Sequence, residues 1–449
     1  MKQRHSALLL LFLLTSLAAC SPGHLGSNVI AFLRDGQLWT IDPNGANAFA
    51  IAAQSPAVIG YSWSPTHQVL AFRSLDSDFA KTAAAKRLVS NEAGGVEDAP
   101  STLSTIGVDG GSPIPVAFSS PDTRYSNAIW DTDGSRLLFR QTARVNPGNP
   151  ASATWWVSQN DQPGGIAIKA LPGSFSIPSL SYVSQQYMSI GNSNRGVFTT
   201  TLAGTNLRLR SSDLLPGHPL PATLERVLWR PAHQDREFLY AAEPSSQAHS
   251  SAALSVQLVL STLNGQKKTL ATCSCTQFAW SPDGNTLLYS TGSTYTIADL
   301  QHTRSFSIAV EPASIPYWSP DSQFLLLNGT HTMKLVHIAS RRQSVLLSDG
   351  SQVTKNNSSS GATNEHLPAI NALLQPVANS VWAADSRHFL FLSSERLSWQ
   401  GQRLSAGKGL YSVTIDNSGH VQGAPVVVDT GKDTQAGWTY QDANTSFLY

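Results

Sequence analysis

A four-residue motif, Trp-Ser-Pro-Asp, followed by a turn and a short apolar run, constrains the fold of this chain more than any other feature. Its clearest copy, residues 280–289, reads Trp-Ser-Pro-Asp-Gly-Asn-Thr-Leu-Leu-Tyr. Pro282 fixes the φ angle that a turn requires, Asp283 can bond its own backbone, and Gly284 tolerates positive φ. The Leu-Leu-Tyr run that follows is strand-forming. The stretch therefore predicts a strand ending in Trp, a tight turn and a second strand.

Related motifs recur along the chain. Altered copies begin at Trp63, Trp130, Trp229, Trp318, Trp382 and Trp438, and a degenerate copy carries Tyr182 in the Trp position. Two further strand-like runs separate most copies, so each unit contains four short strands, named A (which ends in Trp), B, C and D. Four-stranded units repeated around eight times predict an all-β chain that folds as a β-propeller of antiparallel blades.

The spacing of the copies gives the number of blades. Seven intervals separate the eight Trp or Tyr182 positions, and the two ends supply an eighth blade: Trp438 and residues 447–449 from the C-terminus, residues 38–42 and 49–52 from the N-terminus. A ring closed by strands from both termini leaves no free sheet edge. Residues 29–33 also resemble strand B, so either this strand comes from the N-terminus or the last residues add an extra edge. Eight blades are predicted, or seven if the Tyr182 copy is not a blade.

Long insertions are expected at one end of the ring. The shortest interval, from Trp280 to Trp318, is 38 residues. The longer intervals place their surplus between B and C or between D and the next A, at residues 74–102, 142–152, 214–222, 241–254, 350–379 and 394–407. Both kinds of connection leave an up-and-down blade at the same end. Long loops on a rigid scaffold often carry binding residues, so this face is the predicted binding face.

Two of these insertions are predicted to contain short helices. One covers residues 79–89, with Asp78 as its N-cap, and the other covers residues 365–374. In contrast, residues 356–361, Asn-Asn-Ser-Ser-Ser-Gly, have the composition of a flexible linker.

The first residues read as a targeting segment. Lys2 and Arg4 precede the short apolar run 8–14, which is too short to span a bilayer. Leu17-Ala18-Ala19-Cys20 resembles the bacterial lipobox, and this resemblance implies that Cys20 is lipidated, for example with palmitate, and becomes the new N-terminus. The expected organisation is a signal peptide at 1–19, a lipidated cysteine and linker at 20–27, and a propeller at 28–449. The expected location is the extracytoplasmic side of a bacterial cell membrane, or the outer membrane where one exists.

Two further cysteines, Cys273 and Cys275, are separated by one residue. Alternate residues of an extended strand share a face, but their spacing strains a disulfide. The favoured interpretation is two small thiols without a bond between them, and a disulfide carried by a turn is the alternative. These two residues alone do not make a metal site, since tetrahedral sites need further ligands.

Contiguous catalytic and cofactor motifs are missing from the sequence. It contains no Gly-x-Ser-x-Gly or His-Glu-x-x-His motif, and Gly407-Lys408-Gly409 lacks the spacing of a phosphate loop. Asp131-Thr132-Asp133-Gly134 resembles a calcium loop for four residues, but its place in the repeat predicts a turn. We therefore predict no catalytic residue, cofactor or metal, and favour a protein that is not an enzyme. A propeller enzyme with residues scattered over several blades would nevertheless leave no such motif.

Charge and aromatic content narrow the choice of partners. Lys and Arg number 30 against 29 Asp and Glu, a balance that argues against nucleic-acid binding. Most of the 11 Trp residues occupy the repeat position, where a large ring packs between blades. Trp399, inside a B–C insertion, is a weak candidate for an exposed binding residue.

The motif Trp-Ser-Pro-Asp-Gly-x-x-Leu-hydrophobic-Tyr, together with Leu-Trp-Thr-Ile-Asp-Pro-Asn-Gly at 38–45, resembles the TolB-type propeller repeat. The resemblance covers roughly residues 28–449 and implies a propeller, carried here on a bacterial lipoprotein. TolB itself has a separate N-terminal α/β domain and no lipid anchor, so the resemblance does not extend to its partnership with Pal.

The expected function is a membrane-anchored, monomeric scaffold that binds another envelope protein through the loop-decorated face. A carbohydrate or small-ligand receptor is one alternative, and a lyase or cyclase with its site at the channel mouth is another. Converging His and carboxylate groups at the mouth would favour the enzyme, solvent-facing aromatics would favour a sugar, and a broad apolar patch would favour a protein.

Overall fold

The computed structural model describes residues 28–438 apart from several gaps. The gaps are residues 67, 91–98, 132, 144–151, 173, 182, 192–195, 213, 215–219, 221–222, 234–235, 243–254, 292, 312–313, 330–331, 349–373, 376–380, 394–397, 400–401, 404–408 and 431–433. Within the described part, the longest helix has 8 residues, and no helix combines the length and hydropathy of a membrane span.

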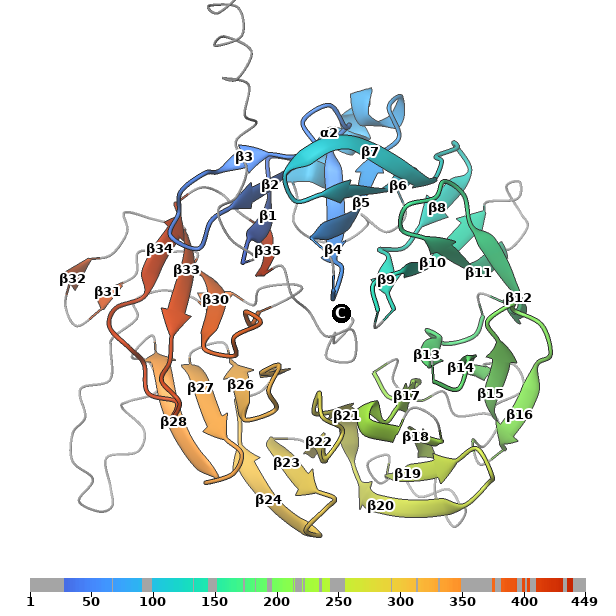
Figure 1. The fold of residues 1–449 in the computed structure, drawn as a ribbon, viewed down its shortest axis with the longest axis vertical. Coiled ribbons are helices and arrows are strands. Elements are labelled where there is room, and N and C mark those ends of the chain that lie inside the picture. The colour runs from blue at the N-terminus through green and yellow to red at the C-terminus, as the bar shows by residue number, and fades with distance from the viewer. Residues whose placement is uncertain are drawn as a thin grey trace, which may run out of the picture.

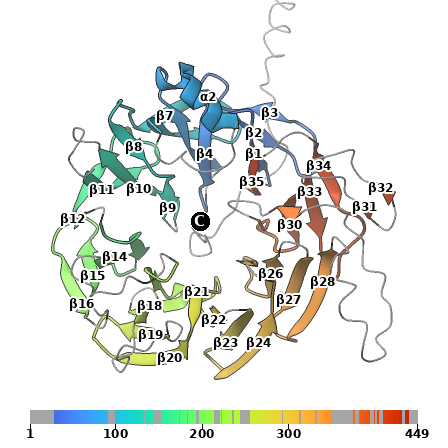
Figure 2. The ribbon, with the colours of Figure 1, turned by 180° about the vertical axis from the view of Figure 1, so that it is seen from behind.

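Eight four-stranded antiparallel blades form a closed ring, which confirms the predicted all-β propeller (Figures 1 and 2). From the inside outward, blade 1 contains β35 (Thr434–Trp438), β1 (Ile30–Arg34), β2 (Gln37–Ile41) and β3 (Phe49–Ala50). Blade 2 contains β4 (Val58–Trp63), β5 (Val69–Leu75), β6 (Ser101–Gly107) and β7 (Gly110–Ala117). Blade 3 contains β8 (Thr123–Tyr125) and β9 (Ile129–Trp130), which both pair with β10 (Arg136–Ala143), then β11 (Ser152–Gln159) and β12 (Ile166–Pro172).

The other five blades repeat the same order. Blade 4 contains β13 (Ser179–Ser181), β14 (Gln186–Gly191), β15 (Gly196–Thr201) and β16 (Arg208–Ser211). Blade 5 contains β17 (Val227–Trp229), β18 (Glu237–Ala242), β19 (Val256–Thr262) and β20 (Lys267–Cys273). Blade 6 contains β21 (Cys275–Trp280), β22 (Thr286–Thr291), β23 (Thr294–Asp299) and β24 (Arg304–Ala309). Blade 7 contains β25 (Ile315–Trp318), β26 (Phe324–Asn328), β27 (Thr332–His337) and β28 (Arg342–Ser348). Blade 8 contains β29 (Leu374–Gln375), β30 (His388–Ser393), β33 (Gly409–Thr414) and β34 (Val426–Asp429).

Blade 1 joins the two ends of the chain. Strand β35 pairs with β1, where Trp438 lies opposite Ile30, and β1 pairs in turn with β2. Strand B of this blade therefore comes from the N-terminus, and the C-terminal region contributes the inner strand. Residues 447–449, expected in this blade, lie outside the described residues.

Blade 4 is a true blade, but its register differs from the prediction. In blades 3, 6 and 7 the Trp of strand A pairs with the residue seven positions later, as Trp280 does with Leu287. In blade 4 the pair with this spacing is Leu180 and Tyr187. Leu180, rather than Tyr182, holds the Trp position, and Tyr182 itself lies outside the described residues.

The repeated Trp residues form the inter-blade core, because each ring reaches back to the preceding blade. In three cases the indole Nε1 donates to a backbone carbonyl in strand A of the preceding blade. The accepting residue is the one just before the Trp position of that preceding blade. These are Trp130 to Ser62 at 3.2 Å, Trp229 to Ser179 at 3.1 Å and Trp382 to Tyr317 at 3.1 Å. The rings of Trp63, Trp229 and Trp280 are almost fully buried. The carbonyl that accepts from Trp229 belongs to Ser179, which independently places Leu180 in the Trp register.

The Ser and Asp of the motif stabilise the A–B turn together. In blade 6, Ser281 Oγ donates to Asp283 Oδ1 at 2.5 Å and accepts from the Thr286 backbone N–H at 3.0 Å. Gly284 has φ +68°, which a side chain with a Cβ rarely adopts. The Asp283 N–H donates to Ser322 Oγ of blade 7 at 3.0 Å, so the turn also joins neighbouring blades.

One insertion contains the predicted helical segment, but with different caps. A 3₁₀ turn, η1 (Phe79–Lys81), precedes helix α2 (Ala83–Ser90), and Asp78 makes no side-chain capping bond. Instead, Asp76 Oδ1 accepts from the Phe79 N–H at 3.0 Å, and Thr82 Oγ1 accepts from the Ala85 N–H at 3.2 Å. Asp78 thus holds the predicted N-cap position of η1, but the capping bond comes from Asp76, and Thr82 caps the separate helix α2. The helix predicted at residues 365–374 and the linker predicted at 356–361 lie almost entirely in the gap at 349–373.

Candidate functional site

The long insertions all leave the ring at one end. Those starting at residues 74, 142, 241 and 394 join strands B and C, and those starting at 214 and 350 join strand D to the next strand A. Because neighbouring strands run antiparallel, both kinds of connection lie at the end where the inner strands begin. We call this the insertion end. One insertion includes the hairpin of β31 (Ser398–Trp399) and β32 (Gln402–Arg403).

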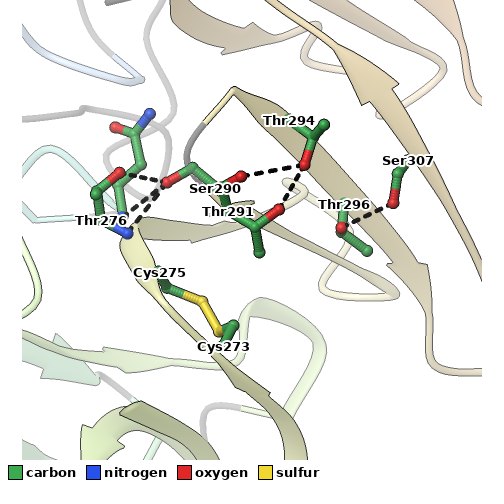
Figure 3. Close-up of a disulfide and its surroundings, with 9 residues drawn as sticks. Cys273, Cys275, Thr276, Ser290, Thr291, Thr294, Thr296 and Ser307 are labelled. Atoms are coloured by element: carbon green, nitrogen blue, oxygen red, sulfur yellow. Dashed lines mark hydrogen bonds between the residues drawn. A yellow bond between two sulfur atoms is a disulfide. The ribbon is translucent and has the colours of Figure 1, made fainter. Parts of the chain in front are cut away.

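A disulfide lies at the insertion end between blades 5 and 6 (Figure 3). It joins Cys273, the last residue of β20, to Cys275, the first residue of β21. The chain changes strands at Ser274, which brings the two Cα atoms to 5.1 Å, within the range that disulfides require. The favoured prediction of two unbonded thiols is therefore wrong, because it assumed one continuous extended strand.

Hydroxyl groups surround this junction and connect the two blades. Thr223 Oγ1, in the connection that precedes β17, donates to the Thr276 carbonyl of blade 6 at 2.5 Å. Ser290 Oγ lies 2.5 Å from Thr276 Oγ1 and accepts from the N–H groups of Thr276 and Gln277 (Figure 3). Strands β21 and β22 change register between Cys275 and Phe278, so Ser290 provides backbone bonds where the sheet ladder is irregular.

The same network continues into blade 7. Gln277 Nε2 donates to Tyr295 Oη, and Tyr295 donates its hydroxyl proton to the Ser314 carbonyl at 2.6 Å. Ser314 comes just before the inner strand of blade 7. Residues from three consecutive blades are thus hydrogen-bonded at the insertion end, and they hold the amide of Gln277 in a fixed position.

Arg226 holds in blade 5 the position that Gln277 holds in blade 6, three residues before the Trp. It immediately precedes β17, and along that strand Val227 and Trp229 are buried while Arg226 and Leu228 are partly exposed. Trp229 packs with the core between blades 4 and 5, whereas Leu228 packs with the core between blades 5 and 6. Since alternate residues of a strand share a face, Arg226 is on the side of blade 6.

No acidic residue in the described part of the chain pairs with the guanidinium of Arg226. No described residue forms an ion pair or hydrogen bond with it, and burial lowers the pKa of Arg226 to about 10. The side chain nevertheless keeps partial exposure to solvent. A cation that is largely surrounded by protein yet reachable from solvent is typical of a recessed binding position.

The corresponding residues of the other blades hold equivalent positions on, or just before, the inner strands of the ring. Three positions before the Trp register lie Gly60, Asn127, Ile177, Arg226, Gln277 and Ile315 in blades 2 to 7. We call this set the mouth ring. A Cβ on Gly60 would lie 2.5 Å from Asn127 Oδ1, so the members from blades 2 and 3 are in contact. In blades 2 to 7 the mouth ring contains one cation, two amides, two isoleucines and one glycine, without any carboxylate or aromatic group.

A second unusual group lies at the opposite end, in the A–B turn of blade 3. Asp131 holds the position of the motif Ser and is 6 % exposed. Burial and the hydrogen bond to Asp133 raise the pKa of Asp131 to about 8. Burial acts to raise the pKa of Asp133, but the hydrogen bond with Asp131 acts in the opposite direction, and the pKa of Asp133 is lowered. The segment forms a turn, as predicted, with the Gly134 N–H donating to the Asp131 carbonyl at 3.1 Å.

The structure does not test the two residues singled out from the sequence, Cys20 and Trp399. Cys20 lies outside the described residues. Trp399 lies in β31, where it pairs with Gln402, and its side chain is not described. Within the described part of the chain, no group of three or more His, Cys, Asp or Glu residues is arranged to hold a metal ion. The mouth ring was not predicted, although counting three residues back from each Trp finds every member except Ile177, which precedes Leu180.

The fold places the chain in the class of eight-bladed β-propellers. No family model matches the sequence, and no curated protein matches it. Solved structures do match the fold. One is a TolB from Acinetobacter baumannii, with 16 % identity over 54 % of this chain and 58 % of the other, at a TM-score of 0.37.

Two further structures resemble a larger part of the chain. An oligogalacturonate lyase in complex with manganese is 11 % identical over 67 % of this chain and 82 % of the other, with a TM-score of 0.45. The dihydro-heme d1 dehydrogenase NirN is 11 % identical over 93 % of this chain and 75 % of the other, with a TM-score of 0.49. At these values the similarities carry no information on function.

Proposed function

We propose that the chain is a membrane-anchored, extracytoplasmic β-propeller lipoprotein that binds a protein partner through its insertion end. The observation that carries the proposal is the segregation of the long insertions to one end of the ring. The A–B and C–D connections of the same blades are mostly tight turns, such as the one at Asn264 and Gly265. A scaffold elaborated on a single face is suited to binding by that face.

Two observations support the proposed location. Leu17-Ala18-Ala19-Cys20 resembles a lipobox, and more than one acyl chain on a cysteine is enough for stable anchoring. The disulfide between Cys273 and Cys275 is the second, because such bonds persist in oxidising, extracytoplasmic compartments.

The anchor is tested by metabolic labelling of the full chain with palmitate. We expect label in the wild type and none in Cys20→Ala, which should also lose its membrane fraction. Label that persists in Cys20→Ala would remove the anchor from the proposal.

The binding face is tested with two photo-crosslinking residues of matched exposure. Ser274 is exposed at the insertion end, and Asn264 is exposed in the C–D turn of blade 5 at the opposite end. We expect a crosslinker at Ser274 to capture one discrete partner in intact cells, and the same group at Asn264 to capture none. Equal products from both positions would contradict binding through one face.

A further inference from the structure

We propose that Arg226 is a subsite for a carboxylate on an acidic peptide segment of the partner. The inference deepens the proposed function and depends on it, because it assigns a chemical role to the face that binds. Its starting observation is a guanidinium between blades 5 and 6 that is mostly surrounded by protein and has no counter-charge among the described residues.

The surroundings of Arg226 favour an incoming anion. A partly buried cation is unfavourable without a counter-charge, so a ligand that supplies one gains a strong interaction. A guanidinium presents paired N–H donors, a geometry that a carboxylate matches with two parallel bonds. No carboxylate occurs in the mouth ring of blades 2 to 7 to compete for it.

The rest of the mouth ring indicates a peptide rather than a sugar. Asn127 and Gln277 present side-chain amides, which both donate and accept hydrogen bonds and therefore complement a peptide backbone. Ile177 is 39 % exposed and Ile315 is partly exposed, so both can cover an apolar side chain of the ligand. In blades 2 to 7 the mouth ring carries no aromatic face on which a sugar ring could stack.

The network around Gln277 gives the subsite a fixed geometry. Thr223 bonds the backbone of Thr276, Ser290 bonds the N–H groups of Thr276 and Gln277, and Tyr295 accepts from the Gln277 amide. The disulfide fixes the strand change just before these residues. Side chains held in this way lose little conformational entropy when a ligand binds.

The experiment follows the Nε–Hε signal of Arg226 by NMR in the full-length protein, assigned by its loss in Arg226→Gln. The probe is the peptide acetyl-Ile-Glu-Ile-amide, and its matched control is acetyl-Ile-Gln-Ile-amide. We expect the Glu peptide to shift the signal at a concentration about 10- to 100-fold lower than the Gln peptide, as for a hydrogen bond to a charged group.

Three variants separate the role of Arg226 from general effects of charge and folding. Arg226→Gln should abolish the preference for the Glu peptide, measured on neighbouring backbone signals, and Arg226→Lys should retain part of it. Arg236→Gln, an exposed arginine of the same blade near its A–B turn, should behave as wild type. If Arg226→Gln does not fold, the loss of the Nε–Hε signal in Arg226→Lys assigns it, and the comparison of the two peptides on the wild type still gives a result.

Equal affinity for the two peptides, or a preference that persists in Arg226→Gln, overturns the proposal. An acidic disaccharide that shifts the Arg226 signal at a lower concentration than the Glu peptide overturns the peptide assignment in favour of a sugar. Failure here would leave the palmitate and Ser274 crosslinking results unchanged, so it is distinguishable from failure of the proposed function.

Discussion

Replacing Asp131 by Ser should stabilise the protein, and the gain should grow with pH. Asp131 stands where the motif has Ser, and its N–H donates to the Arg136 carbonyl at 3.1 Å, as the Ser281 N–H does to Thr286 in blade 6. A serine at 131 can donate to Asp133 without carrying a charge of its own. The variant would therefore restore in blade 3 the turn that blade 6 already has.

The size of the expected stabilisation follows from the pKa of Asp131, which is about 8 in the folded protein and 3.8 as the ordinary value. Between these pH values the folded state keeps a proton that the unfolded state has lost. The unfolded state thus binds fewer protons, and the free energy of unfolding falls by about 1.4 kcal/mol per pH unit. At pH 7 the loss amounts to about 4 kcal/mol from Asp131 alone. Because turns relax and buried acids are partly solvated, we expect a measured gain of about 2–3 kcal/mol in Asp131→Ser.

The assay is urea unfolding followed by Trp fluorescence at pH 4.5, 6 and 7.5, with the difference between variant and wild type read from the midpoints. The matched control is Ser281→Asp, which places two carboxyl groups in the blade 6 turn and should destabilise more as pH rises. A difference between Asp131→Ser and wild type that is flat with pH, or a neutral Ser281→Asp, would refute the reasoning.

Three further predictions concern the core, the disulfide and the ring contacts. Trp229→Ala should lower the free energy of unfolding by about 3–5 kcal/mol, because it removes a buried ring and its bond to blade 4, with Trp229→Phe intermediate; a change near zero in urea unfolding would mean that the ring is not core. The double variant Cys273→Ser, Cys275→Ser should lose only about 1.5 kcal/mol, since the closed loop is very short; a loss several times larger would show that the bond holds native contacts. Gly45→Ala should destabilise the protein more than Gly265→Ala. Both glycines have positive φ, but only at Gly45 would a Cβ meet a carbonyl oxygen of β34, at 2.8 Å. Equal thermal midpoints for the two variants would contradict the contact between blades 1 and 8.

The repeat made the propeller predictable, since a Trp before a tight turn defines both a strand end and an inter-blade contact. The prediction was wrong where the repeat loses its aromatic residue. In blade 4 the sequence offers Tyr182 as the nearest large ring, while the structure uses Leu180. The seven-residue spacing to Tyr187 is the signal that could have identified it.

The candidate site was harder to predict, because its disulfide and the surroundings of Arg226 depend on how neighbouring blades pack together. The disulfide requires a change of strand at Ser274, and the sequence does not mark that residue as a turn. Arg226 belongs to no local sequence motif. Whether its guanidinium is paired depends on how two blades pack together, and among the described residues it has no ion pair. The insertion end, in contrast, was predictable because connectivity alone determines where the loops emerge.

Because β1 pairs with β35, the N-terminal strand of the ring becomes stable only when the C-terminal strand is present. Ile30, Ala31 and Phe32 are fully buried in the finished ring, yet the strand that pairs with β1 on the channel side lies about 400 residues later. During synthesis this edge stays open until Thr434–Trp438 arrives, and an open apolar edge is prone to aggregation. A product cut short before Thr434 would keep seven blades and lose the closure.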